Sequence, residues 1–214
     1  MLETHTLLNS TLVVIQFIAA LLGAVYLLKL KNSYWKWFSI YLIIIFIQEC
    51  FWKFNVSIER QYRVAYYVFF GVPLQYLFLY WLYALKSLKN KNLFFLSVIG
   101  YVLAIGVSLF LKNINEVFSI SISIGTIILI VLIILEFIKQ TNTDNILKFK
   151  GNKMFYINIG LILFYVGSYP FHLLGPELHK NHLDIWNMYF TYFLIANCSM
   201  YLLFSASFIW GKIH

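Results

Sequence analysis

The stretch that decides the fold covers residues 117–138 and reads VFSISISIGTIILIVLIILEFI. Its one charged residue is Glu136, and residues 127–135 are apolar without exception. A helix needs roughly 20 predominantly apolar residues to cross the hydrocarbon core of a bilayer, whereas a strand of a membrane barrel would alternate apolar and polar residues. The stretch therefore predicts a membrane-spanning helix.

The whole chain has the same character. Of its 214 residues, 62% are hydrophobic and only 11% are charged, and the mean hydropathy is +0.80. A soluble domain carries about 25% charged residues, so the composition excludes that class. We expect an all-α, polytopic membrane protein that forms one domain over residues 1–214, with no soluble domain. Its seven predicted transmembrane helices are residues 7–28, 37–54, 64–85, 93–111, 117–138, 154–174 and 187–210.

The basic residues predict how these helices are oriented. Eleven of the sixteen Lys and Arg residues fall in the connectors after the first, third and fifth helices and at the C-terminus. Cytoplasmic connectors carry an excess of Lys and Arg, so we expect the N-terminus outside and the C-terminus in the cytoplasm. A composition rich in Ile, Lys, Asn and Phe suits an AT-rich bacterial genome and hence the bacterial inner membrane. The basic face is expected to meet anionic lipid and not nucleic acid.

Polar side chains deep in a membrane helix indicate function by default. Counted from the outer ends of their helices at about 1.5 Å per residue, Glu49 and Tyr169 lie roughly 9 Å deep, and Gln75 and Asn197 lie roughly 16–18 Å deep. Four predicted helices thus carry a polar residue inward from the same side, as an outward-facing pocket requires. Two prolines beside them, Pro73 and Pro170, are predicted hinges, because proline breaks the helical hydrogen-bond ladder. The predicted ligand-binding residues are Glu49, Gln75, Tyr169, His172 and Asn197.

Each of these residues has a structural alternative. Glu49 precedes Lys53 by four residues, so the two could form an ion pair at the interface. Gln75 and Asn197 could bond to each other or to a backbone carbonyl and hold helices together. An interfacial ion pair is also expected between Glu136 and Lys139. The small residues from Ser119 to Gly125 suggest a loosely packed or wetted segment of their helix.

The connector over residues 172–184 concentrates histidine and acidic residues, and we expect a solvated polar loop there. His179 and His182 are weak candidates for a metal site because nothing fixes a third ligand, so no metal is predicted. The last predicted helix contains no lysine before Lys212, which excludes a covalently bound retinal. No cofactor is expected.

Three functional hypotheses follow. The favoured one is a sensory or regulatory module that binds a small or amphiphilic ligand from outside and acts through a separate membrane or cytoplasmic partner protein. The alternative is a transporter or channel that uses the same polar residues, and the third is an intramembrane hydrolase, although an enzyme is the less favoured class. Small residues on one face of the fourth helix leave a homo-oligomer open; they are Gly100, Ala104 and Ser108.

Overall fold

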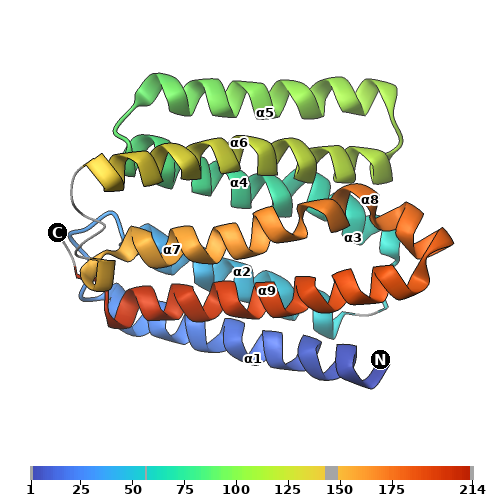
Figure 1. Ribbon diagram of the computed structural model, residues 1–214, viewed down its shortest axis with the longest axis horizontal. Coiled ribbons are helices and arrows are strands. Elements are labelled where there is room, and N and C mark those ends of the chain that lie inside the picture. Colours follow the sequence, from blue (N-terminus) through green and yellow to red (C-terminus); the bar gives the residue numbers. More distant parts are fainter. Residues whose placement is uncertain (1, 56, 143–148, 213–214) are drawn as a thin grey trace. The chain divides into compact units, whose positions relative to one another are not determined.

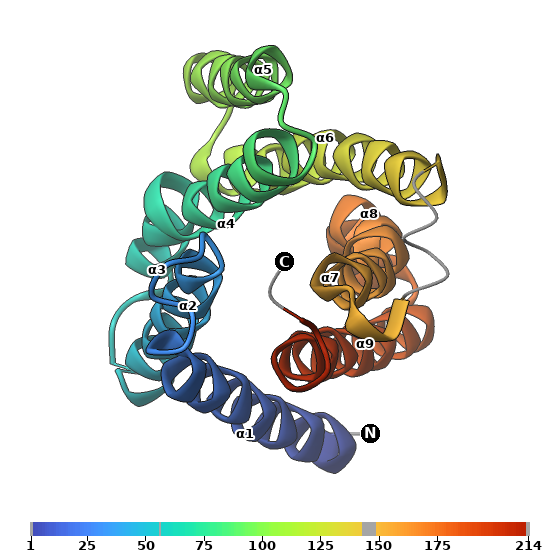
Figure 2. The ribbon, with the colours of Figure 1, turned by 90° about the vertical axis from the view of Figure 1, so that its left-hand side faces the viewer.

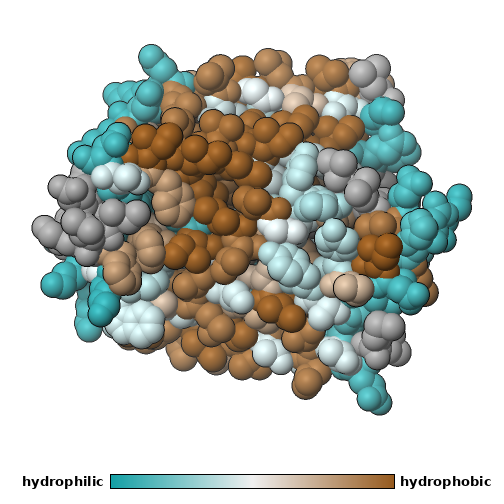
Figure 3. Space-filling view, in the orientation of Figure 1, coloured by the Kyte–Doolittle hydropathy of each residue, from teal (hydrophilic) through white to brown (hydrophobic). Residues whose placement is uncertain are grey.

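The computed structural model of the chain describes residues 2–55, 57–142 and 149–212, including all of their side chains except those of residues 2, 111, 115 and 172–176. This part of the chain consists of helices joined by short connectors, without strands (Figure 1). On the face shown in Figure 3, apolar residues predominate in the middle of the helices, with some residues of intermediate hydropathy among them, and the most hydrophilic residues lie near the helix ends. Seven helical stretches are long and apolar enough to span a membrane, which confirms the predicted class. They are Glu3–Leu27, Lys36–Phe54, Arg60–Ser87, Lys91–Phe110, Glu116–Asn142, Lys153–Phe171 and Leu183–Ile209.

The chain divides into two compact units, each of which is described by itself. Unit 1 comprises Met1–Phe51 and Asp144–His214, and unit 2 comprises Trp52–Thr143. The helices of unit 1 are α1 (Leu2–Leu27), α2 (Lys36–Phe54, up to Phe51), the 3-10 turn η3 (Phe149–Gly151), α7 (Lys153–Leu161), the π-helical turn η4 (Ile162–Val166), α8 (Gly167–Asn181) and α9 (Leu183–Ile209).

Helix α9 is the centre of unit 1, since it packs against α1, α7, η4 and α8 (Figure 2). Glycines allow the closest approaches. A Cβ on Gly160 would lie 3.3 Å from the Met200 Cα atom of α9, and a Cβ on Gly23 would lie 3.3 Å from the Ser39 carbonyl of α2. Small residues at helix contacts are expected in lipid, where van der Waals packing replaces the hydrophobic drive for helices to associate.

Three of the buried tyrosines of unit 2 connect its helices through their hydroxyls. Its elements are α3 (Arg60–Tyr66), η1 (Tyr67–Gly71), α4 (Val72–Tyr80), η2 (Trp81–Ser87), α5 (Lys91–Leu111) and α6 (Ile114–Asn142), with η1 and η2 as π-helical turns. The Tyr76 hydroxyl donates to the Ile122 carbonyl at 3.0 Å, and that of Tyr80 donates to the Gly125 carbonyl at 3.0 Å. The Tyr101 hydroxyl lies 2.8 Å from Ser121 Oγ.

These contacts overturn the expectation of a loosely packed segment from Ser119 to Gly125. Ser121 is fully buried, and a Cβ on Gly125 would lie 2.5 Å from the Tyr76 Cδ2 atom. The side chains of α6 are small here because large aromatic rings from α4 and α5 occupy the space. Small polar residues signal close packing at this position.

The polar loop predicted over residues 172–184 is also wrong, because the backbone of α8 continues as a helix to Asn181 and α9 begins at Leu183. Local interactions favour the longer helix. Asn181 donates to the Glu177 carboxylate one turn earlier at 3.3 Å, and His179 and Lys180 lie in the last turn, where positive charge complements the helix dipole.

Each of the two predicted hinge prolines lies within four residues after a π-helical turn. Pro73 comes two residues after η1, and Pro170 comes four residues after the end of η4. A proline ring clashes with the carbonyl four residues earlier, and a widened turn relieves such a clash. In η4 the Leu163 carbonyl accepts a hydrogen bond of 3.0 Å from the Tyr192 hydroxyl of α9, and Gly167 leaves room for that hydroxyl. The opened backbone is thus satisfied by a neighbouring helix.

Candidate functional site

One stripe of α9 is aromatic along its whole length except at Asn197. Its rings recur at intervals of three and four residues, which places them on one face of the helix. Trp186 stacks on Phe190 at 4.9 Å, and further along Phe204 and Phe208 pack on the Phe38 ring of α2 at 5.3 and 5.7 Å. The stripe consists of Trp186, Phe190, Phe193, Asn197, Tyr201, Phe204 and Phe208.

The contacts of unit 1 fix the level of Asn197 relative to α2. His5 of α1 bonds Thr191 and Tyr26 packs on Phe208, so α1 and α9 are parallel. Phe17 packs on Phe46 and Gly23 approaches Ser39, so α1 and α2 are antiparallel. Helices α2 and α9 therefore run in opposite directions.

Phe38 of α2 faces Phe204 and Phe208 of α9. Because the two helices run in opposite directions, the residue ten positions after Phe38 lies at the same height as residues 194–198 of α9. Gln48 therefore lies at the level of Asn197. Gln16 of α1 adds a third amide, because its neighbour Phe17 contacts Phe46. We call Gln16, Gln48 and Asn197 the amide layer.

The amide layer contains unmet hydrogen-bonding capacity. Gln48 is only 5% exposed, and neither its Nε2 nor its Oε1 atom has a hydrogen-bond partner; the Asn197 Oδ1 atom is likewise buried and unpartnered. Gln16 is also 5% exposed. Burying an amide without a hydrogen bond costs about 1–3 kcal/mol by protein mutational measures, and buried polar groups are normally paired. An amide both donates and accepts, so each of these side chains has the chemistry to bind a neutral polar group such as a hydroxyl, carbonyl or amide.

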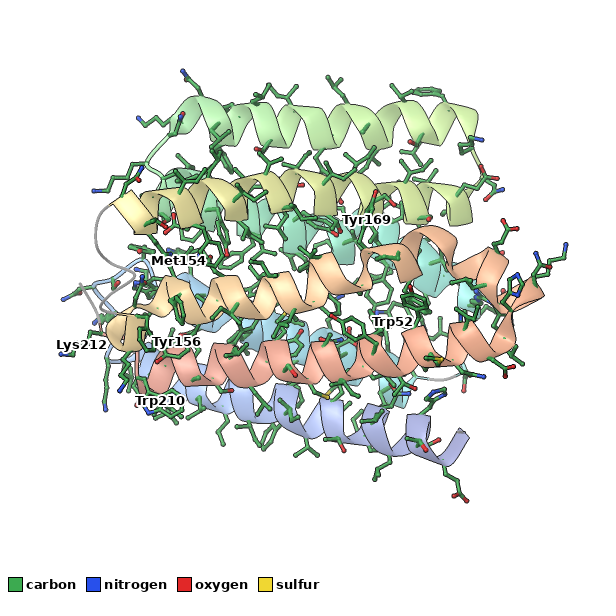
Figure 4. The ribbon with its side chains drawn as sticks, viewed as in Figure 1. Trp52, Met154, Tyr156, Tyr169, Trp210 and Lys212 are labelled. Atoms are coloured by element: carbon green, nitrogen blue, oxygen red, sulfur yellow. The ribbon has the colours of Figure 1, made fainter. Side chains whose placement is uncertain are left out.

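The predicted site residues of unit 1 fall at two levels. Glu49 is half-buried beside Gln48 on α2 and thus lies within about a turn of Asn197 in height. Tyr169 is half-buried on α8 (Figure 4). Gly167 of α8 faces Tyr192 of α9, so Tyr169 lies near the level of residue 190. At 1.5 Å per residue, that level is about 10 Å from Asn197 along the axis of α9. The side chain of His172 lies outside the described part of the chain.

The predicted residues on the third membrane span, Gln75 and Pro73, belong to α4 in unit 2, where both are half-buried. Their place in a common pocket with Asn197 stays a prediction. Within unit 2, Gln75 is next to Tyr76, whose ring is 1% exposed and held on α6.

Unit 2 contains a second polar group, at the end of η2. Glu136 of α6 is only 1% exposed, and its carboxylate accepts hydrogen bonds from Ser87 Oγ at 2.6 Å and Gln140 Nε2 at 3.0 Å. The Lys139 ammonium lies 3.6 Å from the carboxylate and donates to the Ser87 carbonyl at 2.8 Å. The predicted pair of Glu136 and Lys139 is confirmed, but the carboxylate is buried and fastens α6 to the end of the π-helical turn.

The two histidines considered as metal ligands are exposed. The ring of His179 packs edge-on against Trp186 at 4.9 Å, and His182 precedes the first residue of α9. Among the described residues, no three His, Cys, Asp or Glu side chains are close enough together to hold a metal ion.

Sequence reasoning missed Gln16 and Gln48. Gln48 is adjacent to Glu49, whose charge is the more conspicuous signal. A usable signal was the helical spacing, since Gln48 lies seven residues after the buried Tyr41 and Gln16 lies seven residues before the buried Gly23. Comparisons with models of protein families, with curated proteins and with solved structures give no match for this chain.

Proposed function

We propose that this protein is a sensory or regulatory membrane module that binds a small or amphiphilic molecule through the amide layer and acts through a separate partner protein. The observation that carries the proposal is the buried Gln48 amide, which has no hydrogen-bond partner at the level of Asn197. A group of this kind weakens the folded protein unless a ligand satisfies it. Proteins retain destabilising groups of this kind at sites where function needs them.

The aromatic stripe supports an amphiphilic ligand. Trp186, Phe190 and Phe193 lie between Asn197 and the start of α9, and the Phe171 ring of α8 packs on them at 5.6–6.0 Å. A molecule with an apolar body and a neutral polar end would place the body along these rings and the polar end at the amides. Small-molecule sites commonly combine apolar walls with a few polar groups.

Contacts at the other end of unit 1 favour a one-sided site over a transport path. Ser205 and Ser207 of α9 donate their hydroxyls to carbonyls of their own helix at 2.9 and 2.7 Å, so neither hydroxyl proton is available to a transported molecule. At the level of these serines, Phe38 packs against Phe204 at 5.3 Å and adds an apolar ring to this region. A transporter would need polar groups to continue across this region.

Charge supports the orientation in which ligand enters from outside. The helices of unit 1 that begin near His5 carry an acid in the first turn, Glu3 in α1 and Asp184 in α9, whereas α2 and α7 begin with Lys36 and Lys153. The lysine-rich end is therefore assigned to the cytoplasm of a bacterial inner membrane.

The test measures stability and cellular function together. Gln48→Leu and Asn197→Leu remove the unpaired amides, and we expect each to raise the free energy of unfolding by about 1–3 kcal/mol. Asn152→Leu is the matched control, because the Asn152 side chain accepts a hydrogen bond from the Met154 amide at 3.0 Å, and its loss should lower stability. The two stabilised variants should fail to restore the phenotype of a deletion strain. Full complementation by well-folded Gln48→Leu would refute the proposed site.

A further inference from the structure

Unit 1 ends in an unbalanced cluster of positive charge. Six described lysines lie where α1 and α9 end and α2 and α7 begin, and every described acidic residue of unit 1 lies elsewhere. Two helices thus begin with a lysine although the positive end of the helix dipole disfavours one there. The lysines are Lys29, Lys31, Lys36, Lys150, Lys153 and Lys212.

Two exposed lysines are held together at the start of α7. The Lys212 amide donates to the Gly151 carbonyl at 2.9 Å, and the Lys212 stem lies 3.6 Å from the position of a Cβ on Gly151. Lys150 precedes this glycine, and its carbonyl accepts a hydrogen bond of 3.0 Å from the Tyr156 hydroxyl. The Tyr156 ring packs on Trp210 at 6.0 Å (Figure 4).

The cluster extends inward to a buried cation. Lys153 is 4% exposed, and its ammonium donates to the Ser207 carbonyl at 3.0 Å and lies over the Trp35 and Phe208 rings at 5.9 and 5.3 Å. A carbonyl and two ring faces stabilise the ammonium but do not neutralise it, because they carry no net charge. The positive potential at the protein surface is correspondingly stronger.

We propose that Lys150 and Lys212 bind the phosphate of an anionic phospholipid headgroup, with Trp210 beside them at the membrane interface. The unbalanced positive charge favours an anion at this cluster, and Trp210 favours a lipid anion, since its ring is 61% exposed next to Ile209, which is 54% exposed. Exposed indole rings and basic residues together are typical of the membrane–water boundary. This lipid site is separate from the amide layer and goes beyond the proposed ligand-binding function.

The experiment compares lipid retention by the purified full-length protein. Native mass spectrometry would count bound phosphatidylglycerol and phosphatidylcholine with the same acyl chains. We expect the wild type to retain phosphatidylglycerol preferentially, and Lys150→Gln/Lys212→Gln to lose about 30-fold in that affinity, since each lysine near an anionic lipid contributes about fivefold. Lys89→Gln/Lys91→Gln, which removes two exposed lysines of unit 2, should leave retention unchanged.

Three results would overturn the proposal. Equal losses in both double variants would mean a general effect of surface charge. Equal retention of the two lipids by the wild type would show that no anion is recognised. Displacement of phosphatidylglycerol by millimolar inorganic phosphate would show that the lysines bind a soluble anion and not a lipid headgroup. Thermal unfolding of each variant without lipid serves as the folding control, and because both side chains are exposed it should match the wild type.

Discussion

Gly125 of α6 offers a quantitative test of the packing in unit 2. A methyl group at this position would lie 2.5 Å from Cδ2 and 2.6 Å from Cζ of the Tyr76 ring. Carbon atoms in contact are normally 3.5–4.0 Å apart, so Gly125→Ala requires the ring to move by about 1 Å. The ring has little freedom, since its hydroxyl bonds both the Ile122 carbonyl at 3.0 Å and Thr126 Oγ1 at 2.8 Å.

The expected cost follows from these contacts. Overpacking a well-packed core costs about 1–3 kcal/mol, and each weakened hydrogen bond adds about 0.5–1.5 kcal/mol. Replacing glycine by alanine in a helix gains about 1 kcal/mol of stability, so with two weakened hydrogen bonds the net destabilisation is about 1–5 kcal/mol. Gly100→Ala in α5 is the matched control. It has no other atom within 4 Å of the new methyl group and should be neutral or slightly stabilising.

The assay is thermal unfolding of both variants in the same detergent. Since about 2–4 °C corresponds to 1 kcal/mol in a chain of this length, the Gly125→Ala midpoint should fall below that of Gly100→Ala by about 2–20 °C. Tyr76→Leu removes the clashing ring. The loss of stability that Tyr76→Leu causes should therefore be smaller in the Gly125→Ala variant than in the wild type. Equal midpoints for the two alanine variants would refute the placement of Tyr76 against Gly125.

Two further substitutions test single polar contacts. Glu136→Leu leaves Ser87 and Gln140 without their buried acceptor. We expect the free energy of unfolding, measured by chemical denaturation, to fall by about 3–5 kcal/mol. A variant as stable as the wild type would contradict the buried network. Tyr192→Phe removes the donor to the Leu163 carbonyl in η4. We expect it to lower stability by about 0.5–1.5 kcal/mol and to speed hydrogen exchange in η4. Unchanged exchange would mean that this hydrogen bond does not hold the π-helical turn.

The membrane spans were predictable because hydropathy and length alone determine which segments can cross a bilayer. The segment that differs most is the predicted sixth helix, residues 154–174, which continues as α8 to Asn181. A glycine and a proline at residues 175 and 176 suggest a break, and the helical interactions of Glu177 with Asn181 are weak signals in a sequence. Two of the three π-helical turns, η1 and η4, were foreseen only as proline kinks, and η2 was not foreseen.

The candidate site was predictable in part. Asn197 stands out as a polar residue in an apolar helix, and the structure adds that it interrupts an aromatic stripe. The burial of Glu136 could not be predicted, because its partner Ser87 is 49 positions away in the sequence. Gln48 shows the same limitation, since only the packing of Phe38 on Phe204 relates its level to that of Asn197.

The most direct test of the central claim is the accessibility of the amide layer from each side of the membrane. Gln48→Cys and Asn197→Cys would be made in a background of Cys50→Ala and Cys198→Ala and exposed to a membrane-impermeant thiol reagent in vesicles of either orientation. Ile47→Cys is the control, since this side chain is 60% exposed on the apolar surface of α2 and its thiol should stay unreactive in lipid.

An outward-facing site predicts that both cysteines react from the outer face and are protected from the cytoplasmic face. Reaction from both faces would contradict the one-sided site and indicate a transport path. Reaction from neither face, in a protein that folds normally, would show that the amides are sealed packing residues and would contradict the proposed binding function.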